Sequence, residues 1–422
     1  MQIYKFGGGS LVDPNAIEQA IKIVNNIHNE PTLIVISAFA KTTNALENIL
    51  FLARNHMDFS NDLLNLKNFH EKIASYFFKN LNHPIFSDIN QCFQQLEHAL
   101  YNYKNWEYDI HYDATISYGE ILSTTILHYI FDSFHIPNVL LDARDIIITD
   151  TQHRDAIVNW ELTNKMIDEK VKPLLKSNNL FLTQGFIGRS IDGYVSTLGR
   201  EGSDFSAAIF ANCLDAKAVT IWKDVPGIFN ANPKLFKNAV LLHHIDYKEA
   251  FTLAYYGATV LHPKTIKPLQ NKKIKLFVKD FYNPTLDGTL IDDNTSDDEH
   301  ISSLIIKNDQ VLVSIAPKNL LFLNENDLSL IFYTFADLNI RINLMQLDAF
   351  NFYVCVNNDI VKLPILLNKL NESFNTDLTY NLSLVTITYY DKSNFDILNN
   401  SKIYIEQIND NIKQCLVDSI NL

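Results

Sequence analysis

The first forty residues follow the order strand, helix, strand, and this order constrains the fold more than any other feature of the chain. Gln2–Phe6 has the pattern of a short strand, and Thr32–Ser37 is an apolar run typical of a strand covered on both faces. Between them, Asp13 and Pro14 predict the cap and the first residue of a helix. We therefore expect a right-handed βαβ unit at the start of the chain.

The same alternation continues over about 290 residues. A helical pattern runs from Asn44 to about Phe134, and Asp192-Gly193 predicts a hairpin turn between two short extended segments. Further strands are predicted at Asn138–Leu141, Leu180–Gly185 and Val219–Trp222. Alternating strands and helices indicate the α/β class, with a mostly parallel sheet and helices on both faces.

A polar, acidic stretch, Asp292–His300, interrupts this pattern and predicts a linker. A chain of 422 residues exceeds one typical domain, so we expect one domain over 1–292 and another region over 300–422. The second region has short βαββαβ-type units. Its predicted elements are strands Val311–Ala316, Arg341–Leu347, Asn351–Val356, Leu382–Tyr389, Lys402–Gln407 and Ile412–Val417, and helices Asp327–Leu338 and Leu363–Phe374.

Charge and cysteine content exclude several classes of protein. The formal charge of −13 argues against binding to nucleic acid or to an anionic membrane. The four cysteines are widely spaced, which makes a disulfide framework or a zinc site unexpected. No signal-peptide pattern and no bilayer-length apolar run are visible, so we expect a cytoplasmic location.

A glycine-rich turn, Lys5-Phe6-Gly7-Gly8-Gly9-Ser10, follows the first predicted strand. Its glycines allow the backbone to approach a ligand and aim N–H groups at it, and Lys5 can bring a positive charge to a phosphoryl group. No Gly-Lys-Ser/Thr triplet ends the turn, so it is not a Walker loop. By itself the turn indicates phosphate binding, and a plain tight turn is the alternative.

A second glycine-containing segment, Ser196–Asp204, opens an apolar helix. Arg200 can bind a carboxylate with two parallel hydrogen bonds, and Asp204 can orient Lys5 or donors of a ligand. Ser203 or Asp204 is also expected to cap the helix. Capping and ligand binding are compatible.

Two further segments carry charges at informative places. Glu120 lies in the helical run Ile116–Leu127, where burial would require a partner such as a substrate ammonium group. Taken alone, however, that segment favours an exposed glutamate. Lys223 and Asp224 follow a predicted strand, at the usual ligand edge of an open α/β sheet, and can serve a nucleotide or simply belong to a solvated turn.

In this order the motifs resemble those of the aspartate kinases, within the amino-acid kinase family. The resemblance implies a three-layer sandwich with a mostly parallel central sheet, followed by paired α+β ACT-type regulatory domains, one inserted in the other. The matching stretches are Lys5–Ser10, Ser37-Ala38, Thr43-Asn44, Gly119-Glu120, Gly185–Gly188, Thr197–Ala208, Ile221–Gly227, Tyr247–Pro263 and Asn283–Ile291.

The resemblance also implies a reaction: ATP and L-aspartate give ADP and 4-phospho-L-aspartate, the first step toward lysine, threonine and methionine. A carboxylate is already ionised near neutrality, its ordinary pKa being about 3.9, so no general base is needed. Mg²⁺ would be held by phosphates and water, with no metal ligand from the protein. Catalysis then depends on positioning and charge neutralisation.

Carried over position by position, Lys5 and Asp204 match the catalytic pair. Glu120 is expected to take the aspartate ammonium group and Arg200 a carboxylate. The substrate-contact positions are Ser37, Thr43, Glu120, Arg200, Glu201, Gly202 and Ser203. The nucleotide-site positions are Lys5, Phe6, Gly7, Gly8, Lys223, Asp224, Phe229, Lys234, Thr259 and Val260.

The sequence departs from the commoner pattern of this family. Gly9 stands where Thr is usual, Glu201 where Gly is usual, and Lys223 where Thr is usual. The other replacements are Phe229 for Tyr, Asn232 for Asp, Lys234 for Arg and Thr259 for Lys. Our hypothesis is that Lys223 restores the cation missing at position 259.

Two alternatives compete with this interpretation. One is another amino-acid kinase, acting on glutamate, acetylglutamate or a nucleotide, and the other is a non-catalytic amino-acid sensor. A fused homoserine dehydrogenase is not expected, because no segment for it follows Leu422. We expect feedback regulation by lysine, or secondarily threonine, near Ile342 and Asn343, and a homodimer or larger oligomer formed through the ACT region.

Overall fold

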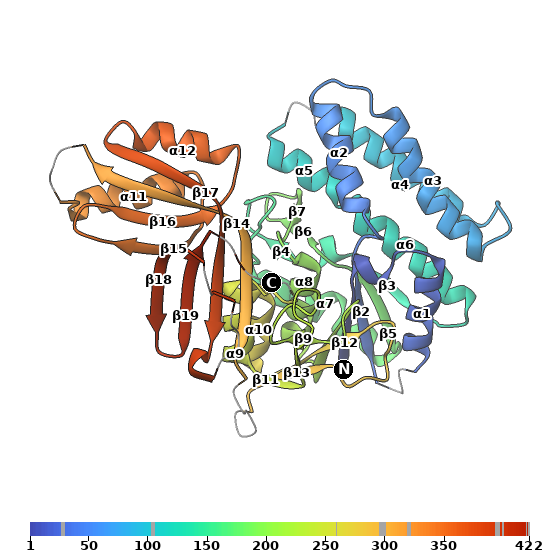
Figure 1. Ribbon diagram of the computed structural model, residues 1–422. Helices are drawn as coiled ribbons and strands as arrows, with labels where there is room; N and C mark the ends of the chain where they lie inside the picture. Colours follow the sequence, from blue (N-terminus) through green and yellow to red (C-terminus); the bar gives the residue numbers. More distant parts are fainter. Residues whose placement is uncertain are drawn as a thin grey trace. The chain divides into compact units, whose positions relative to one another are not determined.

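The structure, a computed structural model, divides into two compact units (Figure 1). It describes residues 1–26, 30–102, 106–258, 260–294, 301–318, 322–392, 397–398, 401–418 and 420. The first unit comprises Met1–Ile228, Leu241–Tyr255 and Thr259–Asp298, and the second comprises Phe229–Val240, Tyr256–Ala258 and Glu299–Leu422. Most of the predicted acidic linker, 295–300, and Thr259 lie outside the described residues.

An eight-stranded sheet forms the centre of the first unit, in the order β11-β13-β12-β8-β1-β2-β5-β3. Strand β1 (Gln2–Phe6) lies in the interior of the sheet and pairs in parallel with β2 (Thr32–Ile36) on one side and β8 (Ala218–Lys223) on the other. Among the described strands of this sheet, only β12 and β13 pair in the antiparallel sense. The outer strands are β3 (Val139–Leu141), β5 (Leu180–Gln184), β11 (His244–Asp246), β12 (Lys275–Asp280) and β13 (Thr289–Asp292).

Helices cover both faces of this sheet. Phe6 and Ile34 face a core formed with α1 (Pro14–Asn25) and α6 (Tyr118–Ser133). On the opposite face α8 (Gly202–Cys213) contacts β1, β2 and β8, and α10 (Pro263–Lys272) packs on α8. The first unit also contains α7 (Trp160–Lys170), which contacts α8, and most of α9 (Tyr247–Tyr256). The predicted α/β class with a mostly parallel sheet between helical layers is therefore confirmed.

The predicted helical block after β2 forms α2 (Thr42–Arg54), α3 (Ser60–Phe77), α4 (Pro84–Asn102) and α5 (Tyr108–Ile116). These helices gather beyond the carboxyl ends of the central strands (Figure 1). Local signals also behave as the sequence predicts. Asp13 caps α1 by accepting a hydrogen bond from the Ala16 N–H at 2.9 Å, with Pro14 as the first helical residue.

The hairpin predicted at Asp192-Gly193 joins β6 (Ile187–Ser190) to the antiparallel β7 (Val195–Thr197). Gly193 has a φ of +94°, a conformation that favours glycine. With the short β4 (Ile148–Thr149), these strands form a separate three-stranded sheet. β7 leads directly into the loop before α8, so the hairpin positions the second predicted glycine segment.

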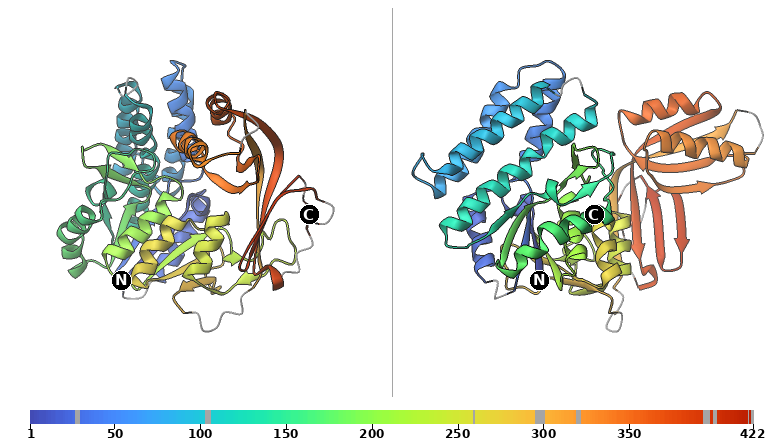
Figure 2. Two further views of the ribbon diagram at one scale, coloured as in Figure 1. Left: turned by 90° about the vertical axis from the view of Figure 1, so that its left-hand side faces the viewer. Right: turned by 180° about the vertical axis from the view of Figure 1, so that it is seen from behind.

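The second unit contains a six-stranded antiparallel sheet in the order β15-β16-β14-β17-β19-β18. Helices α11 (Glu325–Asp337) and α12 (Lys362–Leu370) pack side by side on one face of this sheet (Figure 2). Its strands are β14 (Ser303–Pro317), β15 (Ile342–Leu347), β16 (Phe352–Asn357), β17 (Phe374–Thr388), β18 (Ile403–Asn409) and β19 (Ile412–Val417).

The two longest strands, β14 and β17, tie two lobes of this sheet together. The second half of β14 pairs with the first half of β17, and the segment between these halves supplies α11, β15, β16 and α12. The other halves pair with each other, and β19 and β18 extend the sheet beyond them. The inserted segment forms an α+β lobe of its own, and its pairing with a second ACT-type unit stays a prediction.

The largest errors of the sequence prediction lie at the start of β14, which begins at Ser303 instead of Val311, and at the end of α12. The helix ends at Leu370 instead of Phe374, and β17 begins at Phe374 instead of Leu382. The first half of β17 is polar, so its composition gave no strand signal, but its backbone pairs with β14 from Pro317 to Leu312. Backbone hydrogen bonding, which side-chain patterns do not report, defines this part of the strand.

Candidate active site

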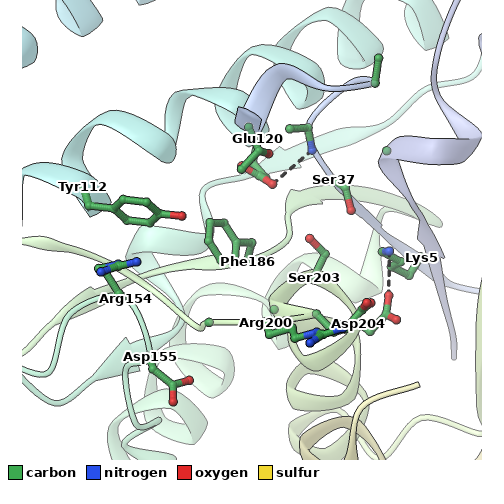
Figure 3. Close-up of a pocket in the computed structure, with 17 residues that line it drawn as sticks. Lys5, Ser37, Tyr112, Glu120, Arg154, Asp155, Phe186, Arg200, Ser203 and Asp204 are labelled. Carbon is green, nitrogen blue, oxygen red and sulfur yellow. Dashed lines mark hydrogen bonds and ion pairs between the residues drawn. The ribbon is translucent and has the colours of Figure 1, made fainter. Parts of the chain in front are cut away.

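A cavity of about 600 Å³ lies in the first unit, where the sheet order reverses around β1. All seven predicted substrate positions line it, together with Lys5, Gly8 and Asp204 (Figure 3). Residues from β1, α6 and the start of α8, which are far apart in the sequence, therefore meet in one place. Their individual roles remain predictions.

Lys5 and Asp204 form a buried ion pair on the wall of this cavity. Lys5 lies on the sheet face opposite Phe6, so its side chain is directed toward α8, whose first turn carries Asp204. The Lys5 Nζ atom is 2.7 Å from Asp204 Oδ1, and Asp204 is completely buried. Burial by itself raises the pKa of Asp204, but the ammonium groups of Lys5 and Lys223 outweigh it and hold the pKa below its ordinary value.

Glu120 is also buried, which contradicts the exposed position that its helical segment favoured. Its α6 neighbour Gly119 packs so closely that an added Cβ would lie 2.9 Å from the Ala38 side chain, and this contact brings Glu120 against the loop after β2. Glu120 Oε1 accepts a hydrogen bond from the Ala38 N–H at 3.2 Å, while Oε2 has no hydrogen-bond partner. Burial raises the pKa of Glu120 to about 8, and the Ala38 N–H and the charge of Lys5 only partly oppose this increase.

The glycine-rich turn approaches the loop after β2 closely. A Cβ on Gly8 would lie 2.7 Å from the Ala38 carbonyl oxygen, so only glycine fits there without a backbone shift. A Cβ on Gly7 would lie 3.2 Å from the Lys5 Nζ atom. The Phe6 side chain, by contrast, packs in the core against Trp222 and Phe281, so only its backbone is available to a ligand.

The amino end of α8 forms another wall, with Ser203 and Asp204 in its first turn. The expected capping by Ser203 or Asp204 is wrong, because the N-cap residue is Glu201 and its side chain makes no capping hydrogen bond. Glu201 has a left-handed backbone with a φ of +55°. The positive end of the α8 dipole and the Arg200 side chain both favour anions in this part of the cavity.

Beyond the glycine-rich turn, the predicted nucleotide residues fall into three groups. Lys223, the last residue of β8, is 3.2 Å from Asp204 Oδ2 and thus reaches the buried pair, and Asp224 follows it. Val260 is half-buried in the first unit, whereas Thr259 lies outside the described residues. Phe229 and Lys234 belong to the second unit, where Lys234 is exposed.

The predicted effector residues, Ile342 and Asn343, begin β15 in the second unit. The Asn343 amide is engaged within the protein: Nδ2 donates to Gln310 Oε1 at 2.8 Å and to Asn357 Oδ1 at 2.9 Å. Its Oδ1 atom accepts a hydrogen bond from Lys307 at 3.4 Å. An effector that used Asn343 would therefore have to exchange these partners.

Sequence reasoning missed the side of the cavity formed by Tyr112, Arg154, Asp155 and Phe186 (Figure 3). The Arg154 guanidinium lies over the Tyr112 ring, 4.6 Å from its centroid. Phe186 is within the Gly185–Gly188 stretch that carried the family resemblance, which could have suggested it. Tyr112 lies on a helix whose pattern gave no indication of a ligand.

Beneath this side lies Asp113, a completely buried carboxylate with several donors. It accepts hydrogen bonds from the Thr197 hydroxyl at 2.6 Å, from the Arg154 N–H at 3.1 Å, and from the His153 ring at 2.8 Å. Burial raises the pKa of Asp113, and these hydrogen bonds oppose the increase. Asp113 therefore fastens the segment of Arg154 to the loop that leads to Arg200.

Comparison with solved structures gives the same architecture. Escherichia coli aspartokinase III in complex with aspartate and ADP superposes with a TM-score of 0.85 and 25% identity, covering 99% of this chain and 96% of that chain. The same enzyme in complex with lysine and aspartate gives a TM-score of 0.81 at 25% identity, covering 99% of this chain and 95% of that chain.

Sequence comparison finds relatives of two lengths. The bifunctional aspartokinase/homoserine dehydrogenase of Buchnera aphidicola is 31% identical over 392 residues, which is 87% of this chain and 46% of that protein. The aspartokinase of Chlamydia trachomatis is 29% identical over 313 residues, or 74% and 69% of the two chains. The chain thus spans less than half the length of the bifunctional relatives that it matches. The model of the amino acid kinase family matches residues 1–280, and the chain belongs to this family.

Proposed function

We propose that the chain is an aspartate kinase, which transfers the γ-phosphoryl group of MgATP to the side-chain carboxylate of L-aspartate. The products are ADP and 4-phospho-L-aspartate. The similarity to the aspartokinases of E. coli, over 99% of this chain, and of Chlamydia trachomatis, over 74% of it, supports this assignment. The bound aspartate and ADP named for the E. coli structure are the ligands we expect here.

The unpartnered carboxylate oxygen of Glu120 is the observation that carries the proposal. A buried carboxylate without a cation is costly, and the ammonium group of an amino acid would remove this cost. Arg200 lines the same cavity and can bind the α-carboxylate. The second carboxylate of a dicarboxylic amino acid is then free to face the Lys5–Asp204 pair.

In the proposed reaction an oxygen of the aspartate side chain attacks the γ-phosphorus, and the bond to the β,γ-bridging oxygen breaks. ADP leaves with that oxygen, and no proton needs to move, because the attacking carboxylate is already ionised. Lys5 neutralises the charge of the phosphoryl oxygens, and Asp204 fixes the position of Lys5. The remaining residues hold the two substrates in line.

An ADP-release assay across acceptors tests the assignment directly. We expect aspartate to exceed glutamate and acetylglutamate by at least about a hundredfold in kcat/KM, because the cavity must place one carboxylate while binding the other. Hydroxylamine trapping of the acyl phosphate identifies the product. Equal rates with all acceptors would favour another amino acid kinase, and amino-acid binding without turnover would favour a sensor.

Regulation and assembly are further parts of the proposal. The E. coli enzyme in complex with lysine and aspartate supports lysine as the effector, with threonine second, bound near Ile342 and Asn343 of the second unit. Activity that ignores both amino acids at millimolar concentration would refute feedback. Among the described residues no helix is long and apolar enough to cross a membrane. Dimerisation through the second unit stays a prediction, to be measured by light scattering.

A further inference from the structure

Asp204 lies between two lysines that come from neighbouring strands. Lys5 of β1 approaches Asp204 Oδ1 at 2.7 Å, and Lys223 at the end of β8 approaches Oδ2 at 3.2 Å. The Lys223 side chain is 16% exposed. Since β1 and β8 are parallel neighbours, both ammonium groups converge at the same carboxyl edge of the sheet. Lys223 is a predicted nucleotide-site residue, and the catalytic roles proposed for Lys5 and Asp204 do not say which groups its charge contacts.

Lys223 has a second partner, Glu201, whose Oε2 atom is 3.5 Å from the Lys223 Nζ atom. Glu201 occupies a left-handed backbone conformation, with φ +55° and ψ +29°, that disfavours residues other than glycine, asparagine and aspartate. Its side chain does not cap α8. The backbone therefore gives no reason for a glutamate here, whereas the ion pair with Lys223 does.

The two carboxylates hold Lys223 unequally. Asp204 is completely buried and is also bound by Lys5, so it cannot easily leave. The Glu201 side chain is 31% exposed, lies farther from Lys223 and lines the cavity. Burial lowers the pKa of Lys223, but Asp204 and Glu201 outweigh this effect and raise it, so Lys223 stays charged at neutral pH.

We infer that Lys223 is a second phosphate-binding cation and that Glu201 is its exchangeable counter-charge. A phosphate oxygen of the nucleotide takes the place of Glu201 on the Lys223 ammonium group, while Asp204 remains in place between the two lysines. The inference rests on the proposed function in one respect, namely that a nucleoside phosphate occupies this end of the cavity. Because the phosphate must displace Glu201 from Lys223, Glu201 weakens nucleotide binding.

The experiment measures the dissociation constant of MgADP by titration calorimetry for the wild-type chain, Lys223→Met, Glu201→Gln and the double variant. Lys223→Met should weaken binding at least tenfold, because it removes a cation and leaves Glu201 facing the phosphates. Glu201→Gln should tighten binding about threefold or more, because the phosphates no longer compete with a carboxylate. It should tighten binding in the Lys223→Met background as well.

Lys217→Met is the matched control. Lys217 immediately precedes β8, at the end of the strand opposite Lys223, and pairs with Glu30 on the surface. MgADP binding should be unchanged by this substitution. An unchanged dissociation constant in Lys223→Met, or weaker binding in Glu201→Gln, would overturn the inference. If Lys223→Met fails to fold, the sign of the effect of the partly exposed Glu201→Gln still decides.

MgADP binding separates this inference from the proposed function, since it requires no aspartate. A wild-type chain that binds MgADP with the expected signs in its variants, but does not phosphorylate aspartate, would refute the proposed function alone. Aspartate phosphorylation combined with weaker MgADP binding in Glu201→Gln would refute the inference alone. A wild-type chain that binds no MgADP would overturn both.

Discussion

Two buried carboxylates face the same cavity, and their surroundings differ. Asp204 is bracketed by the ammonium groups of Lys5 and Lys223, which keep its pKa below the ordinary value despite complete burial. Glu120 receives one backbone N–H, its other oxygen has no partner, and burial raises its pKa to about 8. The charge of Asp204 is therefore balanced within the protein. Glu120, by contrast, has a free oxygen that can bind a cation from a ligand.

The largest expected effect comes from breaking the ion pair between Lys5 and Asp204. Lys5→Ala should lower kcat at least about a thousandfold, equivalent to about 4 kcal/mol, because it removes a cation from the transferring phosphoryl group. Initial rates of ADP release with saturating aspartate measure the loss. Lys22→Ala, at an exposed position on α1, is the control and should leave kcat unchanged. A Lys5→Ala protein with a normal melting curve and near-normal kcat would contradict the assignment.

Changing Glu120, the carboxylate without an ion pair, should affect substrate binding more than the fold. Glu120→Gln keeps the shape and the acceptor for the Ala38 N–H but cannot carry the charge that pairs with an ammonium group. The KM for aspartate should rise about a hundredfold, as is typical when one member of a buried charge pair is removed. The KM for ATP, measured in the same assays, should change less than about twofold.

The thermal stability of Glu120→Gln at pH 7 provides the complementary measurement. At pH 7 most Glu120 side chains are themselves protonated and neutral, so a neutral amide should leave the free protein about as stable as the wild type. A large loss of stability together with an unchanged aspartate KM would show that Glu120 serves the fold and not the substrate. The difference between Glu120 and Asp204 would then not reflect substrate binding.

The raised pKa of Glu120 predicts proton-linked aspartate binding. Below about pH 8 the free protein holds a proton on Glu120, and the incoming ammonium group lowers this pKa, so the proton must be released. Aspartate affinity should therefore fall as the pH decreases from 8, by up to about tenfold per pH unit, and level off above pH 8.

Calorimetry in two buffers of different ionisation enthalpy counts the released proton at pH 7. Glu120→Gln should abolish both the release and the pH dependence, because its amide does not titrate. A wild-type protein whose aspartate affinity is constant between pH 6 and 8 would show that Glu120 is ionised before the substrate arrives.

The same contrast separates what could be predicted from the sequence from what could not. The first βαβ unit and the Asp13 cap follow from local patterns, and the family resemblance pointed to Lys5 and Asp204 as partners although 199 positions separate them. The burial of Glu120 depends on which face of α6 the loop around Ala38 covers. A single helical segment carries no information about that contact.

Other features were missed for a related physical reason. The side of the cavity at Tyr112 and Arg154 is assembled by hydrogen bonds to the buried Asp113, which draws together segments that are distant in sequence. The left-handed Glu201 contradicts the ordinary backbone preference of glutamate, so propensity predicts the wrong conformation. Tertiary contacts determine both, and functional sites are where such local conflicts are expected.

The smallest expected effect concerns the backbone on either side of Arg200. Glu201→Gly relieves a left-handed non-glycine conformation, and the partly exposed ion pair lost with it offsets only part of this gain, so stability should rise by up to about 1 kcal/mol. Gly199→Ala should do the opposite by about 1–2 kcal/mol or more, because Gly199 has a φ of +77° and an added Cβ would collide with Asp155. Urea unfolding with a common slope measures both changes. If Glu201→Gly were strongly destabilising, the Glu201–Lys223 pair would be a structural element comparable to Lys5–Asp204, and the distinction between permanent and exchangeable charges in this cavity would have to be redrawn.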